Sequence, residues 1–353
     1  MLHHTAITYG AIGGWFYKEV APGGSASGLL LIFFCTLNQA WFMGLFFLIA
    51  GYYTPAALQA KGAFRYLRER LVRLGVPLLA FGVVLGPVTI ALAQTARGKS
   101  FVDVLLALWR RGEFEKGPLW FAWALLIFAV LAVAWHALAR PGDTARAAAR
   151  RFPSNVQLLI AALATGVVAF ALRLVWPVGT EVWGLQLGYF ASYVVLFVAG
   201  WVAAAPRWLE HGPREQVRTW RRIAWCTLPV LPIVALWGPR LFGWHGRPEG
   251  GWNVPALVYA LWEPLLAWGV ILGLLQRFQQ CFASLGTFWQ RLARRAFTIY
   301  VIHPTVVVAV TLAWRAVQAP ALLKFAVSGS IACVLCYVLA GVLLRIPGVA
   351  RVL

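Results

Sequence analysis

The chain has 353 residues, of which 61% are hydrophobic and 12% are charged, and its mean hydropathy is +0.75. Apolar residues make up about half of a soluble domain, so this composition excludes a soluble protein and predicts one embedded in a lipid bilayer. The net charge of +20 does not indicate a nucleic-acid partner, because the basic residues are spread through loops between apolar runs. The excess of lysine and arginine in cytoplasmic loops and their attraction to anionic lipids account for these residues.

The chain begins with a short apolar stretch that carries two adjacent histidines. Residues 1–16 read MLHHTAITYGAIGGWF, which is too short and too glycine-rich for a membrane span of about 20 residues. His3 and His4 point to different faces of a helix, so we expect only one of them to line a cavity. That imidazole either takes a proton from a hydroxyl group near neutral pH or is an interfacial residue without a role.

A basic segment follows the first long apolar run. Residues 42–79 read FMGLFFLIAGYYTPAALQAKGAFRYLRERLVRLGVPLL. Arginines and apolar residues occupy opposite faces of the predicted helix, which is typical of a helix that lies in the membrane interface. Its apolar face consists of Phe64, Leu67, Leu71 and Leu74. Arg65, Arg70 and Arg73 indicate either a cytoplasmic topology signal or a docking site for an anionic substrate, because guanidinium groups bind phosphates through paired hydrogen bonds.

Apolar runs predict nine membrane spans after the N-terminal stretch. The spans are 29–53, 73–95, 118–139, 155–176, 185–205, 223–238, 252–276, 296–314 and 325–344. Lysine and arginine are concentrated in alternate loops, which are therefore predicted to be cytoplasmic together with the C-terminus. Because no loop is long enough to fold separately, we expect an all-α polytopic bundle of nine to ten spans without a soluble domain.

Ionisable residues inside predicted spans are candidates for function, because they are costly to place there. Glu263 precedes Pro264, and its carboxyl group is predicted to be protonated, paired with an arginine or exposed to water in a site. Arg173, near the outer end of its span, either extends to the interface or holds a substrate from outside. His303 either faces the same cavity as the N-terminal histidines or bonds to a neighbouring helix.

The sequence contains no motif for a bound cofactor or metal. A phosphate-binding loop, a dinucleotide-binding glycine pattern and the common metalloprotease and hydrolase motifs are all missing, as is any cluster with metal-ligand spacing. The five cysteines lie in or beside apolar spans, which does not indicate a disulfide framework. We therefore expect neither a metal nor a resident cofactor.

Several stretches form an ordered set along nearly the whole chain. They are the His3–His4 pair before a glycine-rich exit, FFLIAGYY, RERLVRLGVPLL, GPLWFAWALLIF, LGYFASYVVLFVAGWVAAAPRWL and TIYVIHPTVVV. This set resembles the family-three integral membrane acyltransferases, and it is most similar to the glucan-modifying, succinyltransferase-like branch. Family members carry a cytoplasmic segment and most of a first helix ahead of the histidine, so we expect residues 1–353 to be one acyltransferase domain with an N-terminally truncated first helix.

The resemblance implies an enzyme of the bacterial cytoplasmic membrane. It implies transfer of an acetyl or succinyl group from cytoplasmic acyl-CoA, a co-substrate, to a hydroxyl of an extracytoplasmic glycan. The His3–His4 pair matches the histidine beside the family's transfer site, and Arg70 and Arg73 match its arginines after the second span. Further positions in matching motifs are Trp120, Glu263 and His303.

Our sequence-based hypothesis assigns roles to these residues. Arg65, Arg70 and Arg73 hold the CoA phosphates. His3 or His4 takes the proton of the acceptor hydroxyl, and Glu263 orients that histidine or stabilises its cation. The remaining assignments are donor binding by Trp120 and His303 and acceptor binding by Arg173. The alternative is a transporter without acyl turnover, since proline-interrupted spans also suit a permease.

Overall fold

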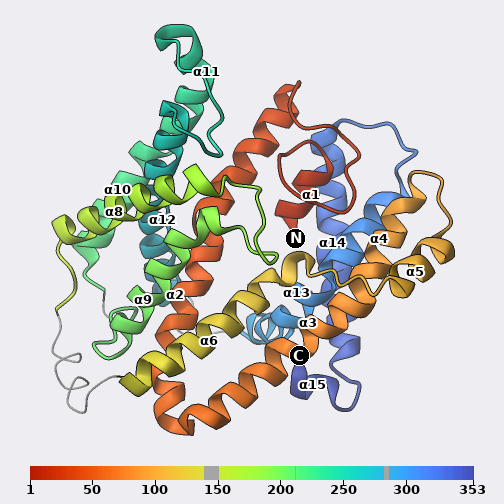
Figure 1. Ribbon diagram of the computed structural model, residues 1–353, viewed down its shortest axis with the longest axis horizontal. Helices are drawn as coiled ribbons and strands as arrows, with labels where there is room; N and C mark the ends of the chain where they lie inside the picture. The colour runs from red at the N-terminus through yellow and green to blue at the C-terminus, as the bar shows by residue number, and fades with distance from the viewer. Residues whose placement is uncertain (139–150, 211, 282–285) are drawn as a thin grey trace. The chain divides into compact units, whose positions relative to one another are not determined.

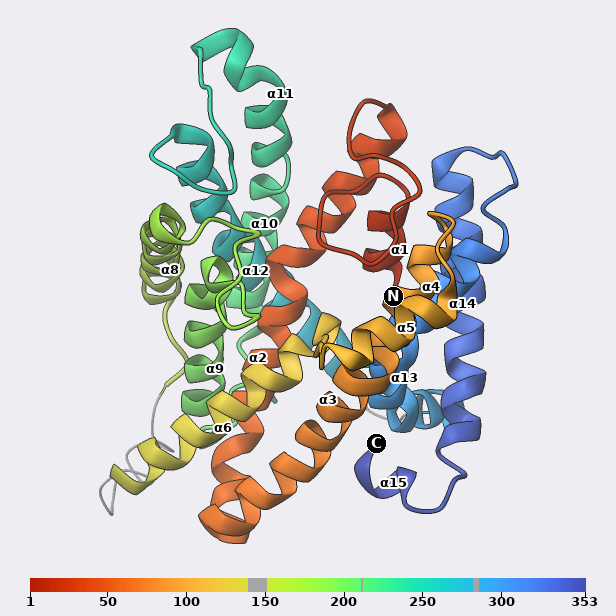
Figure 2. The same cartoon turned by 45° about the vertical axis from the view of Figure 1, so that its right-hand side comes forward.

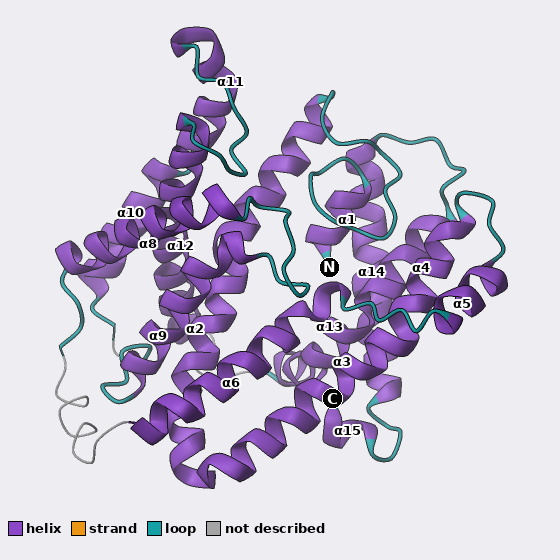
Figure 3. Ribbon diagram, in the orientation of Figure 1, coloured by secondary structure: helices purple, strands orange, loops and turns teal. Residues whose placement is uncertain are grey.

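A computed structural model of the protein describes residues 1–138, 151–210, 212–281 and 286–353. Apart from one isolated β-bridge between Val182 and Leu185, the regular secondary structure of these residues is helical, and Figure 3 shows helices joined by loops. The predicted all-α class is therefore confirmed. The α-helices are α1 Leu2–Thr8, α2 Ala26–Arg70, α3 Val76–Ala80, α4 Gly86–Thr95, α5 Phe101–Arg110, α6 Trp120–Leu138, α8 Asn155–Val175, α9 Phe190–Ala204, α10 Arg214–Thr227, α11 Val230–Phe242, α12 Val254–Cys281, α13 Thr287–Ala313, α14 Ala321–Leu343 and α15 Val349–Val352.

The predicted membrane spans correspond to long apolar helices. In the described part of the chain, eight helical stretches are long and apolar enough to cross a membrane. The first, Ala26–Thr95, is interrupted by non-helical backbone at Gly62 and contains the predicted spans 29–53 and 73–95. Each of the others overlaps one prediction, although residue 139 of the span 118–139 lies outside the described residues. The structure thus confirms a polytopic helical membrane protein.

The stretch from α2 to α4 departs from regular α-helix where glycine and proline require it. Gly62 has φ 71°, a left-handed value that costs glycine little, and it separates the apolar part of α2 from the basic segment. Two π-helical turns, η1 (Leu71–Gly75) and η2 (Phe81–Leu85), come directly before Val76-Pro77 and Gly86-Pro87. Because proline lacks an N–H, the wider turns let the backbone pair again around each one.

The chain divides into two compact units. Unit 1 comprises Met1–Thr36, Leu67–Phe128 and Leu285–Leu353, and unit 2 comprises Leu37–Tyr66 and Ala129–Ser284. Within unit 1, α13 packs against α14 and α4, and α1 packs against α13 and α14 (Figure 1). Within unit 2, α12 packs against α10 and α8, and α8 packs against α9 (Figure 2).

Close backbone contact holds α2 and α9 together in unit 2. A Cβ atom at Gly51 would lie 2.0 Å from the carbonyl oxygen of Phe197, and one at Gly200 would lie 2.0 Å from that of Leu48. Both positions therefore require glycine, as is common where membrane helices approach closely.

Candidate active site

Two histidines from opposite ends of the chain meet in unit 1. The Nδ1 atom of His4, on α1, lies 2.9 Å from the Nε2 atom of His303, on α13. The two rings are nearly parallel, at 6°. The indole ring of Trp15 stacks on His4 with 4.1 Å between centroids and an angle of 8°. The structure therefore joins two predicted site residues that are 299 positions apart.

The hydrogen bonds around His303 determine which nitrogen atoms carry protons. The Nδ1 atom of His303 lies 2.7 Å from the carbonyl oxygen of Tyr300, and a carbonyl oxygen only accepts, so His303 Nδ1 is the donor. In a neutral imidazole the other nitrogen is then an acceptor, so His4 Nδ1 donates to His303 Nε2. This chain leaves His4 Nε2 with the lone pair, as a base requires.

A proline explains why the Tyr300 carbonyl is available. In an α-helix that carbonyl would accept from the backbone N–H four residues later. The residue in that position is Pro304, which has no N–H. Pro304 therefore leaves the Tyr300 carbonyl oxygen without a backbone donor, and the neighbouring His303 donates to that oxygen instead.

The turn before α6 supports the Tyr300 side chain. The Tyr300 hydroxyl donates to the carbonyl oxygen of Pro118, in the 3₁₀ turn η3 Gly117–Leu119. The Tyr300 ring also faces His303, with 6.1 Å between ring centroids. The predicted residue Trp120 begins α6 directly after this turn, and its ring contacts that of Phe121, which in turn contacts Tyr300.

The loop that carries Trp15 is fixed on both sides. The Thr8 carbonyl accepts from the backbone N–H groups of Glu19 and Val20 at 2.9 and 3.1 Å, which folds the loop back onto α1. Lys324 of α14 forms a largely buried ion pair with Glu19 and also donates to the Arg315 carbonyl. These contacts hold the indole over the histidine pair.

One buried donor at this site is not satisfied. The Nε1–H group of Trp15 is buried and has no hydrogen-bond partner among the residues that the structure describes. Buried donors are nearly always paired in proteins, so this N–H is available to an oxygen atom of a bound substrate. No local sequence pattern distinguishes Trp15 from the other tryptophans of the chain.

Burial also changes the acid–base properties of the N-terminal histidines. Helix α1 is outside the candidate membrane spans. Burial lowers the pKa of His3 to about 4, and burial together with the neighbouring His303 lowers the pKa of His4 well below its ordinary value. Both imidazoles are therefore neutral near pH 7. The His3 ring meets His4 edge-on at 5.6 Å, and its carbonyl accepts from the thiol of Cys35.

Glu263 and Arg173 form a second polar cluster, in unit 2. The guanidinium group of Arg173 donates to the Glu263 carboxylate and to the carbonyl oxygen of Gly188 at 3.0 Å. The rings of Tyr189 and Tyr259 lie 5.4 and 4.7 Å from its central carbon. Both charged side chains are buried, so of the alternatives for Glu263 the structure shows pairing with an arginine.

The predicted phosphate-binding arginines lie on two consecutive helical segments. Arg65 is exposed on α2 in unit 2, whereas Arg70, the last residue of α2, and Arg73, in η1, belong to unit 1. Their role in acyl-CoA binding stays a prediction. The described residues hold no group of three His, Cys, Asp or Glu side chains that could bind a metal ion.

Comparison with known families identifies the class of this protein. A family model described as an acyltransferase domain, acyltransferase family 3, matches residues 1–341. The match covers nearly the whole chain, so the protein belongs to this family and is a membrane acyltransferase that moves groups other than amino-acyl groups. Comparisons with curated proteins and with solved structures gave no match. The family therefore favours the enzyme over the transporter.

Proposed function

We propose that this acyltransferase moves an acetyl or succinyl group from cytoplasmic acyl-CoA to a hydroxyl group of an extracytoplasmic glycan, with His4 as the general base. The 2.9 Å contact between His4 and His303 carries the proposal. It belongs to a chain of hydrogen bonds that begins at a carbonyl oxygen freed by Pro304 and leaves a basic nitrogen on His4. The ring-nitrogen contact with His303 belongs to His4, so we assign the base to His4.

In this mechanism His4 Nε2 takes the proton of the acceptor hydroxyl as the hydroxyl oxygen attacks the thioester carbonyl carbon. The C–O bond forms, the C–S bond breaks, and the CoA thiolate takes the proton back from His4 Nε2. The products are an ester and free CoA, and His4 returns to its neutral form. General base catalysis of this kind contributes about 10²–10⁴-fold to the rate.

His303 has a positioning role in this mechanism rather than the donor-binding role suggested by the sequence. Its Nε2 accepts from His4 Nδ1 and fixes the tautomer and the orientation of the base. While His4 carries the extra proton, the same bond shares the positive charge. Trp15 donates its free Nε1–H to the thioester oxygen as negative charge develops there, as donors to an oxyanion do.

The donor side of the proposal depends on the basic segment. Arg70 and Arg73 bind the CoA phosphates at the cytoplasmic surface through charge-assisted hydrogen bonds, and donor binding by Arg65 and Trp120 stays a prediction from the sequence. The positive-inside rule places these arginines and the C-terminus in the cytoplasm of a bacterial cell. We propose that the acceptor approaches from the opposite side of the membrane, and acceptor binding by Arg173 stays a prediction from the sequence.

Acyl transfer by purified protein in proteoliposomes tests this function. Radiolabelled acetyl-CoA or succinyl-CoA is added on one side and a β-glucan oligosaccharide on the other. We expect free CoA and acylated glycan in equal amounts, and only when both substrates are present. No labelled glycan in the presence of both substrates, or acyl-CoA turnover that an acceptor does not accelerate, would contradict the assigned substrates.

A variant pair tests the donor site in the same assay. Replacement of Arg70 and Arg73 by Gln is expected to raise KM for acyl-CoA and to leave KM for the glycan unchanged. Arg240→Gln, on α11 outside the basic segment, is the control. Equal effects of both changes would show that the arginines act through overall charge alone.

A further inference from the structure

Unit 2 contains a cavity that the proposed reaction does not use. It has a volume of about 510 Å³ and is lined by residues of α2, α8, α9 and α12, by the residues 151–153 that precede α8, and by Trp208, Leu209, Gly212 and Val217. This volume is typical of binding sites for small organic ligands, about 300–1,000 Å³. We infer that the cavity binds one acyl chain of an anionic glycerophospholipid, whose phosphate lies at Arg151.

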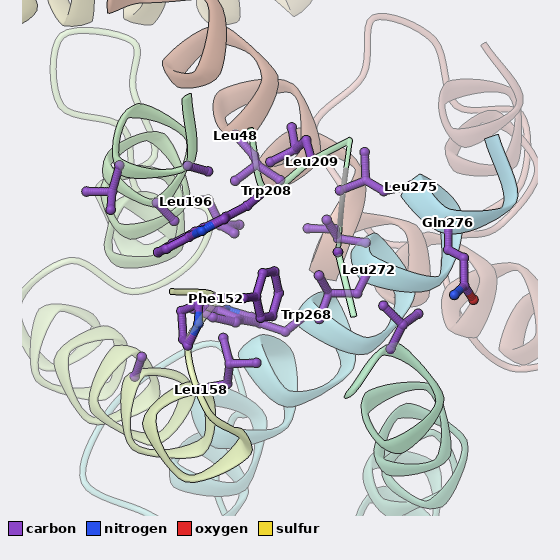
Figure 4. Close-up of a pocket in the computed structure, with 18 of the residues that line it drawn as sticks. Leu48, Phe152, Leu158, Leu196, Trp208, Leu209, Trp268, Leu272, Leu275 and Gln276 are labelled. Atoms are coloured by element: carbon purple, nitrogen blue, oxygen red, sulfur yellow. The ribbon is translucent and has the colours of Figure 1, made fainter. Parts of the chain in front are cut away.

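The walls of the cavity are hydrocarbon. Leu48 of α2, Leu158 of α8, Leu196 of α9 and Leu272 of α12 converge on it, and Trp268 and Phe152 form one side (Figure 4). The polar side chains that line it are Arg151, Gln157, Gln276 and Gln279. A ligand for this cavity therefore has a largely apolar body and a polar group.

The location of the cavity matches the boundary between headgroups and acyl chains. Its lining comes from the first residues of α8 and the last residues of α9 and α12, so it lies at one end of three membrane helices. Trp208 and Trp268 belong to the lining, and tryptophan is typical of the membrane interface. A phospholipid presents its chain and its phosphate at this depth and is always available there.

Charge at the rim favours an anionic headgroup. The Gln157 side chain is used by the N-terminal capping box of α8, and the Gln279 amide donates to the Leu209 carbonyl. Arg151 is exposed and forms no ion pair within the described part of the chain. A guanidinium group at the interface attracts anionic lipid by about 1 kcal/mol, which corresponds to about fivefold in affinity.

The same features disfavour the CoA donor as the occupant. Its nucleotide and phosphates require many polar partners, whereas the walls of this cavity are hydrocarbon and carry indole and phenyl rings. A hydrocarbon chain needs no polar partner along its length, and each buried methylene contributes about 0.8 kcal/mol. The cavity therefore suits the chain of a lipid.

Lipid binding by the purified full-length protein tests this inference. Native mass spectrometry after delipidation in detergent measures the affinity for dioleoylphosphatidylglycerol and for dioleoylphosphatidylcholine. We expect one high-affinity site that prefers the anionic lipid. Ala161→Phe, which fills the cavity from α8, is expected to weaken both lipids about tenfold or more, because displacing two methylenes is sufficient for that loss.

Two control variants make the test specific. Ile160→Phe adds an aromatic ring to the neighbouring position, which is 62% exposed and does not line the cavity, and it should leave lipid affinity unchanged. Arg151→Gln, on the exposed rim, should remove the preference for the anionic lipid while binding of the zwitterionic lipid persists. Unchanged affinity in Ala161→Phe, unchanged preference in Arg151→Gln, or displacement of the bound lipid by acetyl-CoA would overturn the inference.

Discussion

The two polar clusters of this enzyme differ in charge, because one pairs a cation with a carboxylate and the other joins two imidazoles. In unit 2 the Arg173 guanidinium pairs with Glu263 and Gly188 and lies against two tyrosine rings. In unit 1 His4 makes one ring hydrogen bond, to His303, and keeps its other nitrogen. A neutralised charge pair stabilises the fold around it, whereas an imidazole with a free lone pair can take a proton. The difference therefore distinguishes a charge-paired cluster from the one that we propose to be reactive.

The energetic consequences of the two arrangements also differ. Removing one partner of a buried ion pair leaves an uncompensated charge, which costs about 3–5 kcal/mol of stability. Removing the neutral imidazole of His4 leaves no such charge, so we expect it to lower mainly the rate of acyl transfer and to change stability little. Stability and activity measurements on matched variants can therefore distinguish the roles of the two clusters.

The largest expected effect on stability is that of Glu263→Ala. This change leaves the Arg173 charge buried without its carboxylate, so we expect a loss of about 3–5 kcal/mol in the free energy of unfolding. Denaturant titration of the protein in detergent micelles measures it, with Glu181→Ala on an exposed loop as the control. A Glu263→Ala protein of normal stability that fails to turn over would instead support the catalytic role predicted from the sequence.

His303→Ala is expected to lower kcat by about 10²-fold, the size of effect that misplacement of a reacting group produces. The change removes the acceptor that fixes the tautomer of His4. His303→Gln, whose amide oxygen can accept from His4 Nδ1, should recover part of the loss. Steady-state kinetics at several pH values provide the readout, and a change confined to KM for acyl-CoA would support the donor-binding role instead.

Trp15→Phe separates the stacking interaction from the hydrogen bond. Phenylalanine keeps an aromatic ring over His4 but removes the unpaired Nε1–H, so we expect kcat to fall about tenfold, the value of one hydrogen bond. KM should change little if the donor acts on charge that develops in the transition state. Wild-type kinetics in Trp15→Phe would mean that the indole N–H has no catalytic partner.

The smallest effect on activity is expected for Pro304→Ala. Alanine restores an N–H that can bond to the Tyr300 carbonyl and compete with His303 Nδ1. We expect a several-fold loss of kcat together with a higher thermal midpoint, because proline inside a helix costs stability. A variant that is both more stable and fully active would show that the freed carbonyl is not needed to orient the histidine pair.

The pH dependence of the reaction reports the state of His4. Burial lowers its pKa, so the neutral, basic form persists to lower pH than it would in an exposed histidine. The acid limb of the kcat/KM profile should therefore fall below the ordinary histidine value of about 6.5. An acid limb above that value would indicate that a different group supplies the base.

The fold could be predicted from the sequence to a large extent, because long apolar runs leave few alternatives in a bilayer. Each predicted span overlaps a long apolar helix. The π-helical turns η1 and η2 between the basic segment and α4 were not predicted, because π-helical turns have no clear sequence pattern.

The site could be predicted only in part. The rarity of ionisable groups in apolar spans pointed to Arg173, Glu263 and His303, but nothing in their spacing showed which would pair. The contact between His4 and His303 joins positions 299 residues apart, and such a contact depends on how α1 and α13 pack. No local sequence pattern indicated Trp15. The pair His303-Pro304, in contrast, could have indicated that the Tyr300 carbonyl has no backbone partner in the helix.

A side-by-side comparison of His4→Ala and His3→Ala tests the central claim most directly. Each variant removes one imidazole from the same helix. We therefore expect the two variants to differ little in membrane insertion and folding. Acyl transfer from labelled acyl-CoA to the glycan is predicted to fall by about 10²–10⁴-fold in His4→Ala and by far less in His3→Ala. Equal rates in His4→Ala and the wild-type enzyme, or the larger loss in His3→Ala, would contradict the assignment of His4 as the base.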